Sequence, residues 1–226
     1  PVLVDLPKDV QQASCEPAPM RGFTELLPSP THDAIAEAEK LIAAAKRPLF
    51  YLGGGIARAN ASAMVRGIVE ESGIPAVATL QGLGVLPPEH PAMLGMIGMH
   101  GHRPANMAVQ ECDLLIVLGA RFDDRVTGRI DAFSPNSKKV HIDIDPSSVN
   151  KIVRVDIPVI ADCAEALAAI LKEFKSRKAK KPDLKPWRQE IDIWRARKCF
   201  TYANSNTVIK PQHAVERLYE LTRDRE

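Results

Sequence analysis

The stretch LLIVLGARFDDRVTG, from Leu114 to Gly128, joins an apolar run to a charged turn. Leu114 to Leu118 is short, continuous and rich in branched side chains, which is typical of a strand buried on both faces of a parallel sheet. Gly119 opens the turn, and two arginines and two aspartates follow within Arg121–Arg125. Ligands of open α/β sheets bind at the carboxyl ends of the strands, so this turn is a candidate site for a phosphate or a carboxylate. A solvated loop with two ion pairs is the alternative.

Further apolar runs have the length of buried strands, and helical periodicity separates most of them. The runs are Pro48–Leu52, Ile74–Leu80, Lys139–Ile144 and Ile157–Ile160. Helices are expected from Asp33 to Ala45, behind Thr31 as N-cap, and over residues 61–72, 104–111 and 163–174. The glycine- and proline-rich segment from Gln81 to Gly101 is expected to be a loop. Strands that alternate with helices predict an α/β fold with a doubly wound parallel sheet.

Both ends of the chain lack this alternation. Residues 2–6 predict one short buried strand, and the proline-rich segment up to Pro30 resembles an inter-domain tether. Residues 187–200 and the segment from Lys210 onward predict two more helices, and the apolar side of the last one has no partner in a complete sheet domain. We therefore expect residues 1–30 to end a preceding domain, 31–180 to form the sheet domain, and 181–226 to be a linker and the start of a following domain. The chain would then be a piece of a longer protein.

The composition is ordinary for an α/β protein and disfavours several classes of function. The formal net charge is +2, and in the basic segment 172–198 the aromatic residues do not alternate with the basic ones, so nucleic acid is not an expected partner. No apolar run approaches the roughly 20 residues that span a bilayer, so no membrane contact is expected. The four cysteines are scattered without a CxxC pair, which suggests neither a zinc site nor a disulfide framework and fits a cytoplasmic location.

A triple glycine, Gly53 to Gly55, follows the predicted strand Pro48–Leu52. It permits tight packing of strand on helix and close approach of a diphosphate to the backbone. It is not the dinucleotide fingerprint GxGxxG, because Arg58 occupies the last position. The next strand ends in Thr79-Leu80-Gln81, without the acid that holds the ribose of a nicotinamide cofactor. An ordinary NAD site is therefore disfavoured.

Acidic side chains stand instead after the run Lys139–Ile144. Asp143 and Asp145 either accept hydrogen bonds from a ribose or an adenine amine, or cap the turn before Pro146. The same pair has the DxD spacing of phosphohydrolases with an aspartyl nucleophile, but no glycine follows it and the acidic pair Asp123-Asp124 precedes it. That class is disfavoured, as is a Ser-His-Asp hydrolase, because no serine lies in a GxSxG turn.

The loop GMIGMHGH, Gly95 to His102, brings thioethers and imidazoles together. We expect its methionines to line an apolar plate for a flat ring, with a histidine donating to the edge of that ring. Metal ligation by His100 and His102 is the alternative, but no cysteine or acid stands at a supporting spacing. No metal site is predicted.

Taken together, several segments resemble the central domain of acetolactate synthase, the catalytic or large subunit of acetohydroxyacid synthase. They are PVLVDLPKDVQ (1–11), YLGGG (51–55), GMIGMHG (95–101), QECDLLIVLGARFDDRVTG (110–128) and HIDIDP (141–146). The resemblance covers nearly the whole chain. It implies a Rossmann-like domain that binds FAD in an extended pose. Glyoxylate carboligase, another thiamine-diphosphate enzyme, is the closest alternative, but it usually lacks the Asp-Asp pair of Asp123 and Asp124.

The resemblance also implies which residues contact the flavin nucleotide. By motif they are Arg21, Gly53, Gly54, Gly55, Thr79, Leu80, Gln81, Gly98, Met99, His100, Gly101, Gly119, Arg121, Asp123, Arg125, Val126, Asp143, Ile144 and Asp162. In the family the arginine that matches Arg125, beside Asp124, also reaches the active site and holds the second 2-keto acid. A guanidinium fork suits a carboxylate, which gives that positioning role a physical basis.

The enzymes of this family condense two pyruvates, or pyruvate with 2-ketobutyrate, in branched-chain amino acid biosynthesis. The resemblance implies that thiamine diphosphate and magnesium are held by the first and third domains across a dimer, and that the flavin is mostly structural. The chain has no GDG motif for magnesium, so we expect it to be inactive alone. The implied partners are 2-keto acids, further copies of the subunit in a homodimer or tetramer, and a small regulatory subunit. A non-catalytic nucleotide-binding module that mediates assembly is the alternative from another class.

Overall fold

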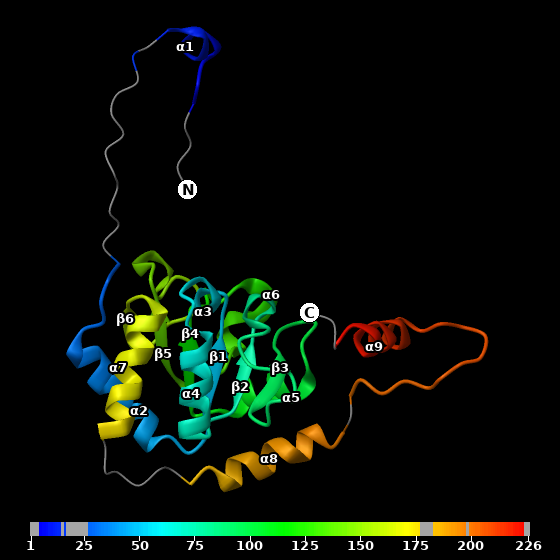
Figure 1. The fold of residues 1–226 in the computed structure, drawn as a ribbon. Coiled ribbons are helices and arrows are strands. Elements are labelled where there is room, and N and C mark those ends of the chain that lie inside the picture. The colour runs from blue at the N-terminus through cyan, green and yellow to red at the C-terminus, as the bar shows by residue number, and fades with distance from the viewer. Residues whose placement is uncertain (1–4, 15, 17–26, 177–182, 198, 224–226) are drawn as a thin grey trace.

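The computed structural model describes residues 5–14, 16, 27–176, 183–197 and 199–223. At its centre lies one parallel sheet of order β3-β2-β1-β4-β5-β6 (Figure 1). The strands are β1 Pro48–Leu52, β2 Ala76–Ala78, β3 Met93–Met96, β4 Leu114–Leu118, β5 Lys138–Asp143 and β6 Ile157–Ile160. Helices cover both faces of this sheet. The predicted α/β fold with a doubly wound parallel sheet is confirmed.

The strand order reverses between β1 and β4, and this reversal positions the site. The chain runs outward from β1 through β2 to β3, and then returns to the other side of β1 as β4 before it continues to β6. In the pairing of β1 with β4, Leu52 lies opposite Leu118, so the two strands end level. The turns after them leave toward opposite halves of the sheet, which opens a crevice at this switch point.

Alternate strand residues supply two separate cores because successive side chains point to opposite faces of the sheet. Phe50, Leu52 and Ile116 pack with helices α2 (His32–Ala44), α4 (Ser62–Ser72) and α7 (Cys163–Ser176) on one face (Figure 1). The other face, with Tyr51 and Val117, packs against α5 (Arg103–Glu111) and α8 (Lys185–Arg195). The short elements are α1 Lys8–Gln12, α3 Gly55–Arg58, α6 Asp124–Thr127, and the 3-10 turns Leu80–Gly82, Ile130–Ala132 and Pro146–Ser148.

Most predicted elements are present, and one strand was missed. The Thr31 cap is confirmed, since its hydroxyl accepts a hydrogen bond from Ala34 N at 3.3 Å. The prediction of a loop over the whole of Gln81–Gly101 is wrong, because β3 lies inside it and forms an edge of the sheet. The strand predicted at Ile74–Leu80 is shorter than expected, because Leu80 begins a 3-10 turn.

The ends of the chain differ in how they pack. The strand predicted at residues 2–6 lies mostly outside the described residues, and Asp5 and Leu6 are exposed and not in a strand.

Helix α8 lies across the amino ends of the strands: the Trp187 indole donates to Pro48 O at 3.1 Å, and Arg195 donates to Pro91 O. Helix α9 (Pro211–Thr222) has no buried residue. The three-part domain division stays a prediction. No described helix has the length and apolar character that a membrane crossing requires.

Candidate functional site

Two glycine turns interlock at the switch point. Gly53 N donates to Leu118 O and Gly55 N donates to Gly119 O, each at 2.9 Å, so the turn after β1 lies directly on the turn after β4. A Cβ on Gly53 would lie 2.2 Å from Gly119 O, and one on Gly55 would lie 2.7 Å from Gly119 Cα. Gly119 itself has φ +58. These glycines are therefore required by the contact of one backbone turn with another, whereas the sequence predicted packing of strand on helix.

The charged turn after β4 presents its side chains outward. Asp123 caps α6, because its carboxylate accepts from Arg125 N at 3.1 Å. That bond comes first among the causes that hold the pKa of Asp123 below its ordinary value, and the charges of Arg121 and Arg125 add to it. The side chains of Arg125 and Asp124 are 78% and 86% exposed, and their ion pair is long, at 4.0 Å. The guanidinium groups are therefore available to a ligand anion.

The loop after β3 is fastened to this turn. Met99 N donates to Arg125 O at 3.1 Å, and a Cβ on Gly98, whose φ is +104, would lie 2.6 Å from the same oxygen. Asn106 on α5 clamps the loop from the other side: its amide donates to Gly98 O and accepts from Gly98 N, both at 2.9 Å. The segment that holds the exposed Met99 and His100 thus has a fixed position beside α6.

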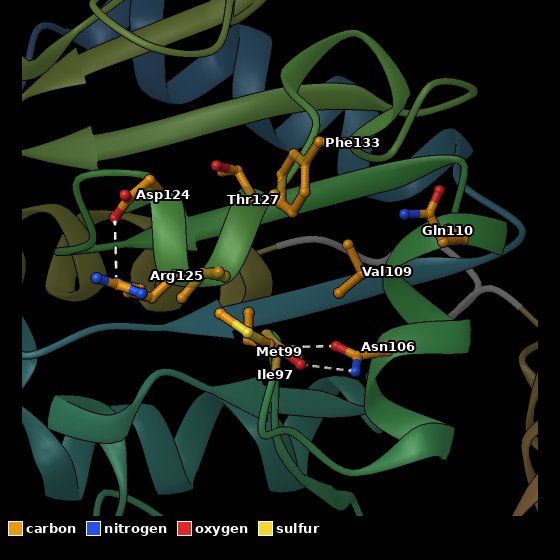
Figure 2. A pocket seen from close by; sticks show the side chains of 12 residues that line it. Ile97, Met99, Asn106, Val109, Gln110, Asp124, Arg125, Thr127 and Phe133 are labelled. Atoms are coloured by element: carbon orange, nitrogen blue, oxygen red, sulfur yellow. Dashed lines mark hydrogen bonds and ion pairs between the residues drawn. The ribbon is translucent and has the colours of Figure 1, made fainter.

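A cavity of about 360 Å³ opens between this loop, α5 and α6 (Figure 2). Its apolar wall includes Ile97, Val109 and Phe133, and Arg125 and Asp124 stand at one side of it, joined by their ion pair. Such a cavity, apolar with a few placed polar groups, is typical of sites for small molecules. The remaining lining residues are Gly98, Met99, Asn106, Gln110, Val126, Thr127 and Gly128.

The turn after β2 lies next to the glycine turn of β1. Thr79 Oγ1 accepts from Gly82 N at 3.1 Å and so begins the 3-10 turn Leu80–Gly82. A Cβ on Gly54 would lie 2.9 Å from the Gln81 Cβ, so these two turns touch. Leu80 is 68% exposed, which leaves an apolar side chain on the carboxyl edge of the sheet for a ligand to cover.

Beyond β5, two aspartates have different surroundings. Asp145 caps the turn before Pro146, since its carboxylate accepts from Ser147 N and Ser147 Oγ, both at 2.9 Å; these bonds lower its pKa. The capping alternative therefore holds for Asp145. Asp143 is buried, and one carboxylate oxygen accepts from Asp145 N at 2.9 Å. A buried and hydrogen-bonded carboxylate such as that of Asp143 does not fit an exposed aspartyl nucleophile.

The floor of the site beneath the β4, β5 and β6 turns contains Cys163. Burial, followed by the charges of Asp162 and Asp143, raises the pKa of its thiol to about 12. Asp162 follows β6, is half-buried and accepts from Ala164 N at 2.8 Å.

The structure brings the sequence-predicted residues together at one edge of the sheet, with one exception. Arg21 lies outside the described residues. Asp143 is the last residue of β5, and the others occupy the turns and short helices that follow the carboxyl ends of β1 to β6. Sequence reasoning missed the cavity residues Asn106, Val109, Gln110, Thr127 and Phe133, and also the buried His141. No local pattern in the sequence marks Asn106, because its role depends on the folded position of Gly98.

The side chain of His102, in the loop after β3, contacts an aromatic ring and a backbone oxygen. His102 stacks on Phe200, with ring centroids 4.6 Å apart, and its Nδ1 contacts Leu94 O at 2.9 Å. Across the part of the chain that the structure describes, no group of three or more histidine, cysteine, aspartate or glutamate side chains is placed to hold a metal ion.

Comparisons with known proteins match the sequence of this chain to a family. The family described as "Thiamine pyrophosphate enzyme, central domain" matches residues 35–170. The chain is 38% identical to the acetolactate synthase isozyme 3 large subunit of Escherichia coli, over 99% of this chain and 40% of that protein. It is 41% identical to the acetolactate synthase large subunit of Corynebacterium glutamicum, over 96% and 36%. Against the chloroplastic acetolactate synthase 1 of Zea mays the identity is 40%, over 99% and 36%. The chain thus spans about two fifths of the length of these relatives.

Proposed function

Because this chain belongs to the thiamine pyrophosphate enzymes, whose central domain it contains, we propose that it is the FAD-binding part of an acetolactate synthase large subunit. The observation that carries the proposal is the convergence of glycine turns, arginines and carboxylates along one edge of the sheet, centred on the β1/β4 switch point. That edge runs across six strands, or about 24 Å at a spacing of about 4.8 Å, which suits an extended dinucleotide better than a mononucleotide.

The chemistry of the edge fits the parts of FAD in order. Asp143 and Asp162, after β5 and β6, supply carboxylates for the hydroxyls of a ribose. The glycine turn at Gly53–Gly55 and the exposed guanidinium of Arg121 suit the diphosphate, since backbone approaches closely there and arginine forks match phosphate oxygens. The flavin ring would lie toward β2 and β3, where Leu80 and Met99 are 68% and 66% exposed and the cavity opens.

The reaction we propose for the whole protein is the condensation of pyruvate with a second 2-keto acid, in the biosynthesis of branched-chain amino acids. Arg125, whose side chain is 78% exposed beside Asp124, would hold the carboxylate of that second substrate. Thiamine diphosphate and Mg²⁺ would be bound by parts of the protein other than this sheet domain. The flavin, once bound, would stabilise the fold and order the β3 and β4 turns around Arg125, and no hydride transfer is proposed.

Assembly and location follow from the same family. We propose that subunits of the whole protein associate with each other, and with a small regulatory subunit, in the cytoplasm. Apart from Arg21, the residues that we propose as FAD contacts all follow or end strands of one sheet.

Flavin titration of the full chain tests this function. FAD should remain with the protein through gel filtration, and Arg121→Ala should weaken the affinity by about tenfold or more, because it removes a charge-assisted contact. Arg129→Ala is the matched control: Arg129 is also exposed, but it pairs with Asp131 at 2.9 Å and should be silent. If ADP binds and FAD does not, the chain is a generic nucleotide module. If neither binds, the proposed FAD site is wrong.

A further inference from the structure

His141 is a fully buried side chain between two of the turns that form the candidate site. It lies on β5, and the sheet register aligns it with Val117 of β4 and Tyr51 of β1 on the same face. Because the His141 side chain has no exposed surface, it cannot contact a ligand directly. Burying a polar group costs free energy unless the group is hydrogen-bonded, so a buried imidazole is expected to have a hydrogen-bond partner.

The ring of His141 contacts both neighbouring turns through one atom. Nε2 lies 2.8 Å from Ala120 O, and a carbonyl can only accept, so Nε2 carries the hydrogen. The same nitrogen lies 3.6 Å from the Asp143 Oδ2. Ala120 belongs to the turn after β4, directly before Arg121, whereas Asp143 ends β5. One N–H group therefore faces an oxygen from each of the two segments.

Aromatic rings close this contact from solvent. Phe122 packs edge-on to His141 with centroids 5.0 Å apart, and it also contacts Tyr51 and Phe133. Phe122 has φ +56, a conformation that bulky residues rarely adopt and that persists only where the surroundings enforce it. The other ring nitrogen, Nδ1, has no hydrogen-bond partner among the residues the structure describes. The ring is thus held by one polar contact point, at Nε2.

We propose that His141 is a positioning residue that fixes the Ala120–Asp124 turn relative to Asp143 and so sets the spacing between the phosphate-binding and ribose-binding ends of the site. This rests on the proposed function, since Arg121 and Asp143 are FAD contacts only under that proposal. The device is mechanical: Nε2–H donates to Ala120 O at 2.8 Å and lies 3.6 Å from Asp143 Oδ2, which is too long for a second hydrogen bond. The buried ring therefore spaces the two segments before the ligand arrives, which reduces the ordering cost of binding.

Two substitutions separate this role from simple packing. His141→Leu keeps a similar volume but removes the donor. His141→Gln places an amide N–H at about the same distance along the side chain as Nε2. Val140→Ala is the matched control: Val140 is the preceding residue of β5, fully buried in the core on the opposite face. Val140→Ala should lower the free energy of unfolding but should leave both turns in place, because Val140 packs on the other face of the sheet.

The measurements are FAD affinity by flavin fluorescence, the urea midpoint of unfolding, and amide hydrogen exchange of Asp145, whose N–H donates to Asp143 Oδ1. We expect His141→Leu to weaken FAD binding by about tenfold and to speed exchange at Asp145, His141→Gln to restore both within about threefold, and Val140→Ala to change only the urea midpoint. Wild-type binding and exchange in His141→Leu would overturn the inference, as would equal losses in His141→Leu and Val140→Ala.

A chain that does not bind FAD would refute the proposed function alone. Hydrogen exchange would still decide the role of His141 in that case, because it is measured without ligand. The tautomer gives an independent check if His141→Leu fails to fold: nitrogen NMR of the wild-type chain should show the proton on Nε2, and a proton on Nδ1 alone would overturn the inference.

Discussion

At the scale of single residues, the switch point depends on positions where only glycine fits. Gly53→Ala should destabilise the chain by about 3 kcal/mol or more, because the added Cβ would lie 2.2 Å from Gly119 O, which cannot move without losing its hydrogen bond from Gly55 N. Gly67→Ala, in α4, is the control: nothing lies within 4 Å of its added Cβ, and alanine is the better helix former, so a gain of about 0.5 to 1 kcal/mol is expected. Urea unfolding measures both.

A Gly53→Ala chain as stable as the wild type would show that the two turns are not in backbone contact. The inference would then fail for Gly55 as well, because its packing against Gly119 is of the same kind.

Cysteine reactivity is a second prediction at this scale. Burial raises the pKa of the Cys112 thiol to about 11 and that of Cys163 to about 12, so at pH 8 both are neutral and shielded, whereas Cys199 is exposed. With Cys15 replaced by serine, a disulfide reagent should label one thiol in the folded chain and three after unfolding.

Rapid labelling of more than one thiol at pH 8 in the folded chain would contradict the burial of Cys112 and Cys163.

The same pKa shifts make the free energy of unfolding depend on pH. A thiol whose pKa is raised by folding contributes stability that is complete below its ordinary pKa of 9.0 and is lost as the pH rises toward 11 and 12.

Single residues also show where sequence reasoning reaches its limit. The charged turn around Arg121–Arg125 could be predicted because glycine and clustered charges after an apolar run are visible locally. His141 and Asn106 could not, since each acts through a backbone carbonyl or peptide group whose place depends on the folded sheet. Ala120 O is 21 residues from His141, and nothing in the local pattern links them.

At the scale of elements, the strands that could be predicted from the sequence are those formed by an uninterrupted run of apolar residues. The bounds of β1 and β4 match the runs Pro48–Leu52 and Leu114–Leu118, because central parallel strands are apolar throughout. Strand β3 was missed since it contains Gly95 with φ +106 and pairs irregularly with β2 at the edge of the sheet. The candidate site follows the same pattern: the turn after β4 could be located from the sequence, and the cavity beside the β3 loop could not.

Helix α8 is predicted to be held mainly by Trp187. Trp187→Phe should cost about 1 to 3 kcal/mol, because it leaves Pro48 O without its indole donor, and Trp187→Ala about 3 to 5 kcal/mol, because it also leaves a cavity. Ile193→Ala, at a position 63% exposed on the same helix, should stay within about 0.5 kcal/mol of the wild type. Thermal unfolding measures the loss of stability in all three variants. Equal losses for Trp187→Ala and Ile193→Ala would refute the prediction that Trp187 holds α8 in place.

The β3 loop is predicted to depend on its clamp from α5. Asn106→Ala removes both hydrogen bonds to Gly98 and should release the loop, with a loss of about 1 to 2 kcal/mol and faster amide exchange at Met99. Gln110→Ala, one turn further along α5 and lining the same cavity, is the control. If both variants leave exchange at Met99 unchanged, Asn106 does not hold the loop.

At the scale of the whole molecule, the amino ends and the carboxyl ends of the strands differ in what covers them. We call these two sides of the sheet its amino edge and its carboxyl edge. The amino edge is covered by α8, whose Trp187 and Arg195 bond to backbone at the starts of β1 and β3. The carboxyl edge carries the glycine turns, exposed arginines and exposed apolar side chains around the switch point. This division leaves the carboxyl ends of the strands uncovered by α8, and the parallel sheet brings residues as far apart in the chain as Gly53 and Asp162 to those ends.

The most direct test of that arrangement is a crystal structure of the chain grown with saturating FAD. The account predicts an extended FAD along the carboxyl edge, with its diphosphate at the Gly53–Gly55 turn and Arg121, and its ribose near Asp143. A flavin bound at the amino edge beside α8, or crystals without flavin at that concentration, would contradict it.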